Sequence, residues 1–263
     1  MSFALFQSYP IAYTSYGAGK NTVVLLHGFC EHQFMWADLI QDFQGEARIL
    51  TIDLPGFGRS AFIPEAQIET YADAVKAALD HEQISTCILA GHSMGGYVAL
   101  AFAKRYPEML SGLGLLHSHP FEDDEPKKAS RERALEFVKE NGSKRYIKEL
   151  FQGLFSDAFK NNHSDRYNEF ISRCSEGCDT TVIQAIQAMR CRPDHTETLK
   201  HVKGPVLFII GKSDTTIAYT RSLEMALLPE RAQVEIRNCG HMGIIEDPLM
   251  LSDVLKSFLI KNI

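Results

Sequence analysis

Short runs of apolar residues alternate along this chain with longer stretches in which apolar residues recur every three or four positions. Runs of the first kind are typical of strands buried on both faces of a parallel sheet, and six are predicted: residues 23–26, 49–52, 87–90, 113–116, 206–210 and 234–236. Stretches of the second kind predict amphipathic helices, among them residues 68–79, 97–102 and 251–259. This alternation predicts an α/β fold built on a mostly parallel, doubly wound sheet.

One long segment departs from this pattern. Residues 118–201 predict helices alone, and charged residues are denser there than in the rest of the chain. A high density of charge is typical of a small unit that exposes much of its surface. We therefore expect a core made of residues 1–117 and 202–263, with a helical cap inserted at residues 118–201.

Composition limits the classes of protein that this chain could belong to. Its 263 residues are 45% hydrophobic and 23% charged, which is ordinary for a globular protein and excludes a disordered or collagen-like chain. The net charge of −6 predicts no partnership with nucleic acid or an anionic membrane. We expect no membrane span, no secretion signal and, with only six cysteines, reduced thiols in the cytoplasm.

The segment Gly91-His92-Ser93-Met94-Gly95 directly follows the apolar run 87–90 and precedes a predicted helix. A serine between two glycines at such a junction sits on a tight turn that lifts its hydroxyl above the sheet, where larger neighbours would collide with the adjacent strand and helix. The pattern predicts that Ser93 is a catalytic nucleophile.

A serine nucleophile needs a base and an acid that orients the base. Asp214 follows the predicted strand 206–210, and His241 lies just past the predicted strand 234–236. The chain order Ser93, Asp214, His241 is the order of an α/β-hydrolase triad. Glu246 and Asp247 are rival acids, but they lie too near His241 in sequence, so we predict a triad of Ser93, His241 and Asp214.

An oxyanion hole needs two backbone N–H donors. We predict that Met94, directly after the nucleophile, supplies one of them. The other is expected from the loop after residues 23–26, where Phe29 is the candidate. His27, in the same loop, is interpreted as a structural residue that hydrogen-bonds the loop.

Five motifs together resemble the α/β-hydrolase superfamily: Leu25-Leu26-His27-Gly28-Phe29, Asp53-Leu54-Pro55-Gly56-Phe57-Gly58-Arg59-Ser60, Gly91-His92-Ser93-Met94-Gly95, Gly211-Lys212-Ser213-Asp214 and Gly240-His241. The chain is most similar to small bacterial carboxylesterases and carbon–carbon hydrolases with a helical cap. That resemblance implies a cap that closes over the triad and binds the acyl or alcohol part of the substrate. Haloalkane dehalogenases and epoxide hydrolases carry aspartate where Ser93 stands, which excludes both.

Two other motifs resemble a cofactor site and a metal site, but each is incomplete. The segment Gly56 to Ala61 fits a dinucleotide fingerprint, but Pro64 interrupts the helix that should follow, so no cofactor is predicted. His117 and His119 hint at a metal cluster but lack a complete ligand pattern, so no metal is predicted. We interpret these histidines as lining a strand end, where contact with substrate stays open, and the acidic residues 122–124 as a solvated stretch.

We therefore predict a serine hydrolase that cleaves a small-molecule carboxylic ester through an acyl-enzyme, without cofactor or metal. Alternatives on the same triad are a carbon–carbon bond hydrolase, a lactonase or a perhydrolase. In the carbon–carbon hydrolases an arginine of the returning cap binds the substrate carboxylate; Arg190 or Arg192 stands in that region, although we interpret both as solvated surface residues. A low-turnover ligand sensor is a further alternative. Nothing in the sequence indicates an oligomeric state.

Overall fold

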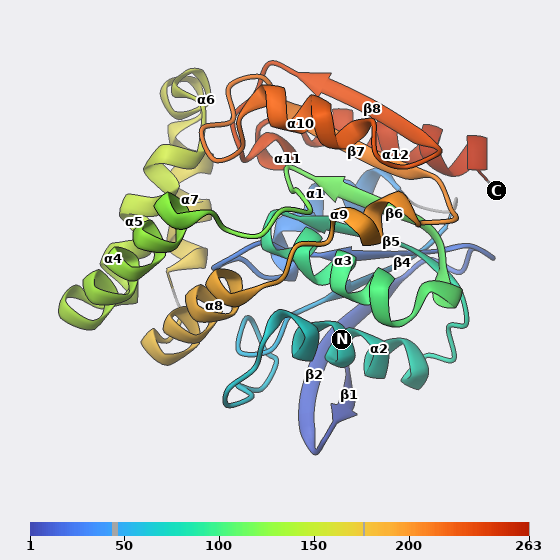
Figure 1. Cartoon of the computed structure of the whole chain (residues 1–263), viewed down its shortest axis with the longest axis horizontal. Coiled ribbons are helices and arrows are strands. Elements are labelled where there is room, and N and C mark those ends of the chain that lie inside the picture. Colours follow the sequence, from blue (N-terminus) through green and yellow to red (C-terminus); the bar gives the residue numbers. More distant parts are fainter. Residues whose placement is uncertain (44–46, 176, 263) are drawn as a thin grey trace.

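A single β-sheet lies at the centre of the molecule, with helices around it (Figure 1). The computed structural model describes residues 1–43, 47–175 and 177–262, in which eight strands form one sheet in the order β1-β2-β4-β3-β5-β6-β7-β8. The strands are β1 (Ser2–Phe6), β2 (Tyr9–Tyr16), β3 (Thr22–Leu26), β4 (Arg48–Ile52), β5 (Cys87–His92), β6 (Leu110–Leu116), β7 (Val206–Gly211) and β8 (Ala232–Arg237). All six predicted runs lie in strands β3 to β8, which confirms the predicted fold class.

Strands β3 to β8 pair in parallel, and their register aligns their carboxyl ends. Leu26 of β3 pairs with Gly91 of β5, and Leu116 of β6 pairs with both His92 of β5 and Ile209 of β7. The loops that follow these four strands therefore meet at one edge of the sheet, where open α/β sheets place their sites.

The two N-terminal strands did not emerge from the sequence pattern. β1 pairs antiparallel with β2, and β2 pairs antiparallel with β4. The hairpin turn is made by Gln7 and Ser8, which both adopt positive φ values, 48° and 74°. Turns of this kind usually contain Asn or Gly, so the sequence lacks the usual indication of a hairpin.

Helices cover both faces of the sheet (Figure 1). Helix α2 packs on α3, which in turn contacts α9, and α1 packs against α12 on the other face. The helices around the sheet are α1 (Ala37–Asp42), α2 (Ile68–His81), α3 (Met94–Arg105), α9 (Thr196–Lys200), α10 (Tyr219–Ala226), α11 (Gly243–Glu246) and α12 (Pro248–Asn262), with short 3₁₀ turns η1 (Gln33–Trp36) and η2 (Pro107–Met109). Within the described ranges, no helix is both long and apolar enough to cross a membrane.

Five further helices lie between β6 and β7 in the chain and gather at one side of the molecule (Figure 1). They are α4 (Glu125–Asn141), α5 (Ser143–Leu154), α6 (Asp157–Asn162), α7 (Ser164–Cys174) and α8 (Asp179–Cys191). Gln184 of α8 donates a hydrogen bond to the carbonyl of Ile63 in the core, at 2.8 Å. The carbonyl of Leu154, which ends α5, accepts hydrogen bonds from the N–H groups of His241 (2.9 Å) and Met242 (3.3 Å). The inserted helices thus contact the loop that carries His241.

Candidate active site

Ser93 occupies the junction between β5, which ends at His92, and α3, which begins at Met94. Its backbone is held at φ 48° and ψ −114°, a strained conformation typical of functional turns. A Cβ atom on Gly91 would lie 2.2 Å from the carbonyl group of Gly95, and one on Gly95 would lie 2.5 Å from the Leu26 oxygen. Glycine is therefore required on both sides of Ser93, as its spacing predicted.

The structure brings the three predicted catalytic side chains together. His241 Nε2 lies 2.9 Å from Ser93 Oγ, and His241 Nδ1 lies 2.8 Å from Asp214 Oδ2. The side chains of His241 and Asp214 are almost fully buried, whereas Ser93 is half-buried. This chain of hydrogen bonds is the geometry in which an imidazole can take the proton of the serine hydroxyl.

Asp214 is fixed as a carboxylate. The N–H groups of Thr216 and Ile217 donate to its Oδ1 at 2.8 and 3.1 Å. Burial alone would raise the pKa of Asp214, but the charge of His241 and the donors around the carboxylate outweigh burial and hold the pKa well below its usual range. An ionised Asp214 can hold His241 with Nδ1 protonated and Nε2 facing Ser93.

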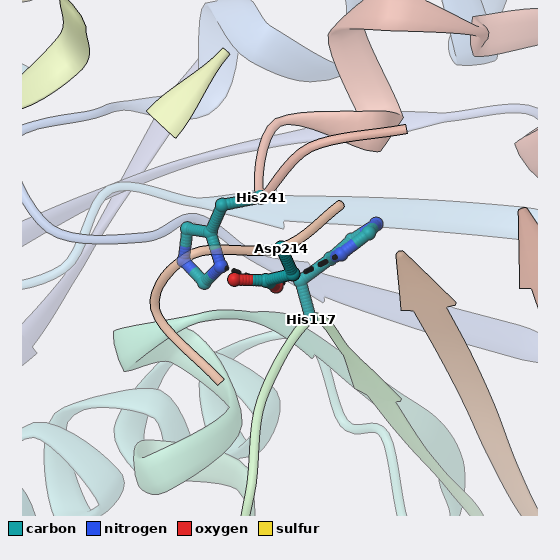
Figure 2. Close-up of side chains that lie close together, drawn as sticks. All are labelled: His117, Asp214 and His241. Carbon is teal, nitrogen blue, oxygen red and sulfur yellow. Dashed lines mark hydrogen bonds and ion pairs between the residues drawn. The ribbon is translucent and has the colours of Figure 1, made fainter. Parts of the chain in front are cut away.

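A second histidine, His117 at the end of β6, approaches the same carboxylate from the other side (Figure 2). Its Nδ1 lies 3.4 Å from Asp214 Oδ2, and the ring is fully buried. Burial lowers the pKa of His117 to about 4, so the ring is neutral at pH 7. Ligand atoms of His117, Asp214 and His241 lie within 4.8 Å of one another, a spacing at which three groups could bind one metal ion. In the structure, however, both imidazole rings are directed at the carboxylate of Asp214.

The predicted oxyanion donors, Phe29 and Met94, belong to neighbouring loops at this edge. Within residues 1–43, 47–175 and 177–262, neither backbone N–H is engaged in a hydrogen bond. Met94 is also the first residue of α3, whose N-terminal end favours negative charge. Both N–H groups are therefore available to a developing oxyanion.

The rival acids face elsewhere. Glu246 accepts hydrogen bonds from the N–H (2.9 Å) and hydroxyl (2.6 Å) of Ser156, and Asp247 accepts one from the N–H of Met250. Neither carboxylate is directed at His241, whose Nδ1 is bound to Asp214. Glu246 instead ties the segment before α6 to the loop after β8.

The interpretation of Arg192 and Asp123 as solvated surface residues is wrong. Both are almost fully buried, and Arg192 Nη1 lies 2.7 Å from Asp123 Oδ1. The guanidinium of Arg192 also stacks 3.9 Å above the ring of Tyr97 and donates to the carbonyl of Phe121. Arg190, by contrast, is half-buried, and its Nε lies 3.4 Å from Glu132 Oε2. A charged pair of this kind cannot be seen in the local pattern, because a solvated and a buried Asp have the same sequence context.

The other predicted histidines have structural contacts. His27 Nε2 accepts from the N–H of Leu54 at 2.9 Å while its Nδ1 donates to the Gly28 carbonyl at 2.8 Å, which confirms its structural interpretation. His119 Nε2 lies 3.2 Å from the hydroxyl of Tyr97, and its ring stacks on that of Phe121.

A cavity of about 670 Å³ lies between the loop after β3 and helices α5, α7 and α8. Cys30 and Phe57 of the core and Ile147 and Val182 of the inserted helices are among its lining residues. Neither Phe29 nor Tyr146 is among these lining residues, and their rings contact each other at 6.3 Å between centroids. The aromatic side chains Phe151, Phe155 and Phe170, by contrast, pack against one another within the inserted helices.

Fold and site together define an α/β hydrolase. The model of the α/β hydrolase fold family matches residues 21–248, so the chain belongs to that family, and hydrolysis is the reaction class that this membership supports. This confirms the resemblance seen in the five motifs.

Individual relatives carry different chemistries. The chain is 27% identical to a 2-hydroxy-6-oxononadienedioate/2-hydroxy-6-oxononatrienedioate hydrolase from Paraburkholderia phymatum, over 95% of this chain and 90% of that protein. A thermophilic esterase from Thermogutta terrifontis has a similar structure, with a TM-score of 0.91 and 29% identity over 96% of this chain and 94% of that one. An enol-lactonase from Burkholderia xenovorans, at 18% identity and a TM-score of 0.91 over 98% and 99%, shares the fold.

Proposed function

We propose that this protein is a serine hydrolase that cleaves a small carboxylic ester through an acyl-enzyme. The observation that carries the proposal is the continuous hydrogen-bonded chain from Ser93 through His241 to Asp214. The likeness to the Thermogutta terrifontis esterase favours an ester as the substrate.

In the proposed mechanism, His241 Nε2 removes the proton of Ser93 as the hydroxyl oxygen attacks the ester carbonyl. The N–H groups of Phe29 and Met94 hold the resulting oxyanion, and Asp214 stabilises the imidazolium. Collapse of the tetrahedral intermediate expels the alcohol, which takes the proton from His241. His241 then activates a water molecule that attacks the acyl-enzyme and releases the acid and free Ser93.

We also propose that residues 118–201 act as the cap of this enzyme, over a core of residues 1–117 and 202–263. The contacts of Leu154 with the His241 loop and of Tyr146 with Phe29 support this role. In this position the cap would bind the acyl or alcohol part of the substrate.

A carbon–carbon bond hydrolase is the second candidate. The Paraburkholderia phymatum relative is named as a hydrolase of a hydroxy-oxo-dienedioate, and it aligns over most of both chains. The triad is compatible with either reaction. The two proposals differ in the bond that water cleaves, so a substrate panel separates them.

The test is hydrolysis of p-nitrophenyl esters from acetate to laurate by the wild-type protein and by Ser93→Ala. Turnover should have an optimum at one chain length, and the variant should lose about 10⁴-fold or more of it while keeping its fold. If wild type shows no Ser93-dependent ester turnover, the ester proposal fails. A ring-cleavage dienoate and a lactone are then the next substrates, and a single slow burst with retained product would indicate a sensor.

A further inference from the structure

Glu31 lies in the same loop as Phe29, two residues further along the chain, and its carboxylate is buried. It is 2% exposed, and its Oε2 accepts a hydrogen bond of 2.6 Å from the N–H of Gly28. The N–H of Glu31 in turn donates to the Gly28 carbonyl at 3.3 Å, which closes residues 28–31 into a tight turn. Cys30, inside this turn, has a positive φ of 61°. The carboxylate therefore holds a strained turn in place.

The same oxygen of Glu31 also binds His92, the residue before the nucleophile. His92 Nδ1 lies 3.0 Å from Glu31 Oε2, and His92 Nε2 lies 3.1 Å from the carbonyl oxygen of His241. Both ring nitrogens thus face acceptors, so His92 must carry a proton on each nitrogen to satisfy them. The ring has no exposure to solvent.

A buried charge is stable only when it is paired and hydrogen-bonded. Burial alone would lower the pKa of His92, but the charge and the hydrogen bond of Glu31 outweigh burial, and the pKa is raised. Burial alone would likewise raise the pKa of Glu31, but the charge of His92 and its donors outweigh it, and the pKa is lowered. The raised pKa of His92 and the lowered pKa of Glu31 both agree with a buried ion pair.

This pair joins three segments that are distant in sequence: the turn with Phe29, the junction with Ser93 and the loop with His241. A Cβ atom on Gly28 would lie 2.7 Å from Glu31 Oε2 and 2.8 Å from His92 Nδ1, so the contact has no room for a larger residue. Because the Gly28 N–H is taken by Glu31, it cannot serve as an oxyanion donor, which agrees with the prediction that the next N–H, that of Phe29, has this role.

We propose that Glu31 and His92 are positioning residues, whose buried contact holds the oxyanion turn and the His241 loop in register with Ser93. The inference rests on the proposed serine-hydrolase function. It predicts that loss of the contact lowers the rate of every step that places charge on the oxyanion, whatever the substrate.

The test uses a fluorophosphonate probe, which phosphonylates an activated serine and therefore needs no knowledge of the natural substrate. Labelling rates and ester kinetics are measured for wild type, Glu31→Gln and His92→Asn, with Ser93→Ala to show which labelling depends on Ser93. Glu82→Gln is the matched control, because Glu82 accepts from Tyr13 and Arg48 at the far end of α2. Urea unfolding gives the folded fraction of each variant, so that all rates refer to folded molecules.

We expect Glu31→Gln and His92→Asn to lose about tenfold or more in labelling rate and kcat with KM within about twofold, and Glu82→Gln to match wild type. Rates per folded molecule within twofold of wild type, or failure of both variants to fold, would overturn the positioning role and leave the pair as a folding element alone. Absence of Ser93-dependent labelling in wild type would instead refute the serine-hydrolase function, and this inference with it.

Discussion

Acidification should destabilise this protein through His117. The ring is fully buried, and its pKa is lowered from 6.5 to about 4. As the pH falls below about 6.5, the unfolded chain takes up a proton that the folded protein does not. The contribution of His117 to stability is thus fully present above pH 6.5 and is lost as the pH falls toward 4. Over that window the loss is about 3 kcal/mol.

The comparison that isolates this effect is wild type against His117→Asn. Asparagine does not titrate and tolerates the positive φ of 49° at this position. Trp36, the single tryptophan of the chain, is fully buried and can report unfolding in urea by its fluorescence. The free energy of unfolding is measured at several pH values between 7 and 4 for both proteins and for His163→Asn, which changes an exposed histidine.

The free energy of unfolding of wild type, minus that of His117→Asn, should fall by about 3 kcal/mol between pH 7 and pH 4. His163→Asn should run parallel to wild type. A difference between wild type and His117→Asn that stays constant within about 1 kcal/mol over this range would refute the claim that His117 is held neutral by burial.

Three further predictions follow from single contacts. Asp214→Asn should lower kcat/KM for the best ester about 10⁴-fold per folded molecule, because the amide no longer holds the required tautomer of His241. Arg192→Met should lower the free energy of unfolding in urea by about 3 kcal/mol, since it removes one of the two arginines that pair with the buried carboxylate of Asp123, Arg131 being the other, whereas Arg190→Met should cost less than about 1 kcal/mol. Tyr146→Ala should move the p-nitrophenyl ester optimum to longer chains, because it removes a ring beside Phe29; an unchanged optimum would place the acyl group elsewhere.

The strands β3 to β8 and the junction at Ser93 were predictable because their causes are local. A fully buried parallel strand is an uninterrupted apolar run, and a nucleophile on a tight turn needs glycine on both sides. The hairpin of β1 and β2 was missed for an equally local reason. Its turn residues, Gln7 and Ser8, adopt positive φ without being the residue types that usually do so.

The interactions of the buried polar residues could not be predicted in this way. Glu31 and His92 are 61 positions apart, and each looks like an ordinary loop or strand-end residue in its own segment. Arg192 was misjudged for the same reason. Whether a charged side chain is exposed to solvent or buried in an ion pair depends on which distant residues the fold places next to it.

The sequence alone thus determined the fold class, the chain order of Ser93, Asp214 and His241, and the loops that carry the predicted oxyanion donors. Periodicity, glycine spacing and strand ends are properties of short segments, so each can be recognised from neighbouring residues alone. The tertiary structure decided that His117 shares the carboxylate of Asp214, that Glu31 and His92 join three loops, and that the carbonyl of Leu154 binds the His241 loop. Those contacts depend on sheet register and on how the inserted helices meet the core, and free energies of burial and pairing between distant segments set both.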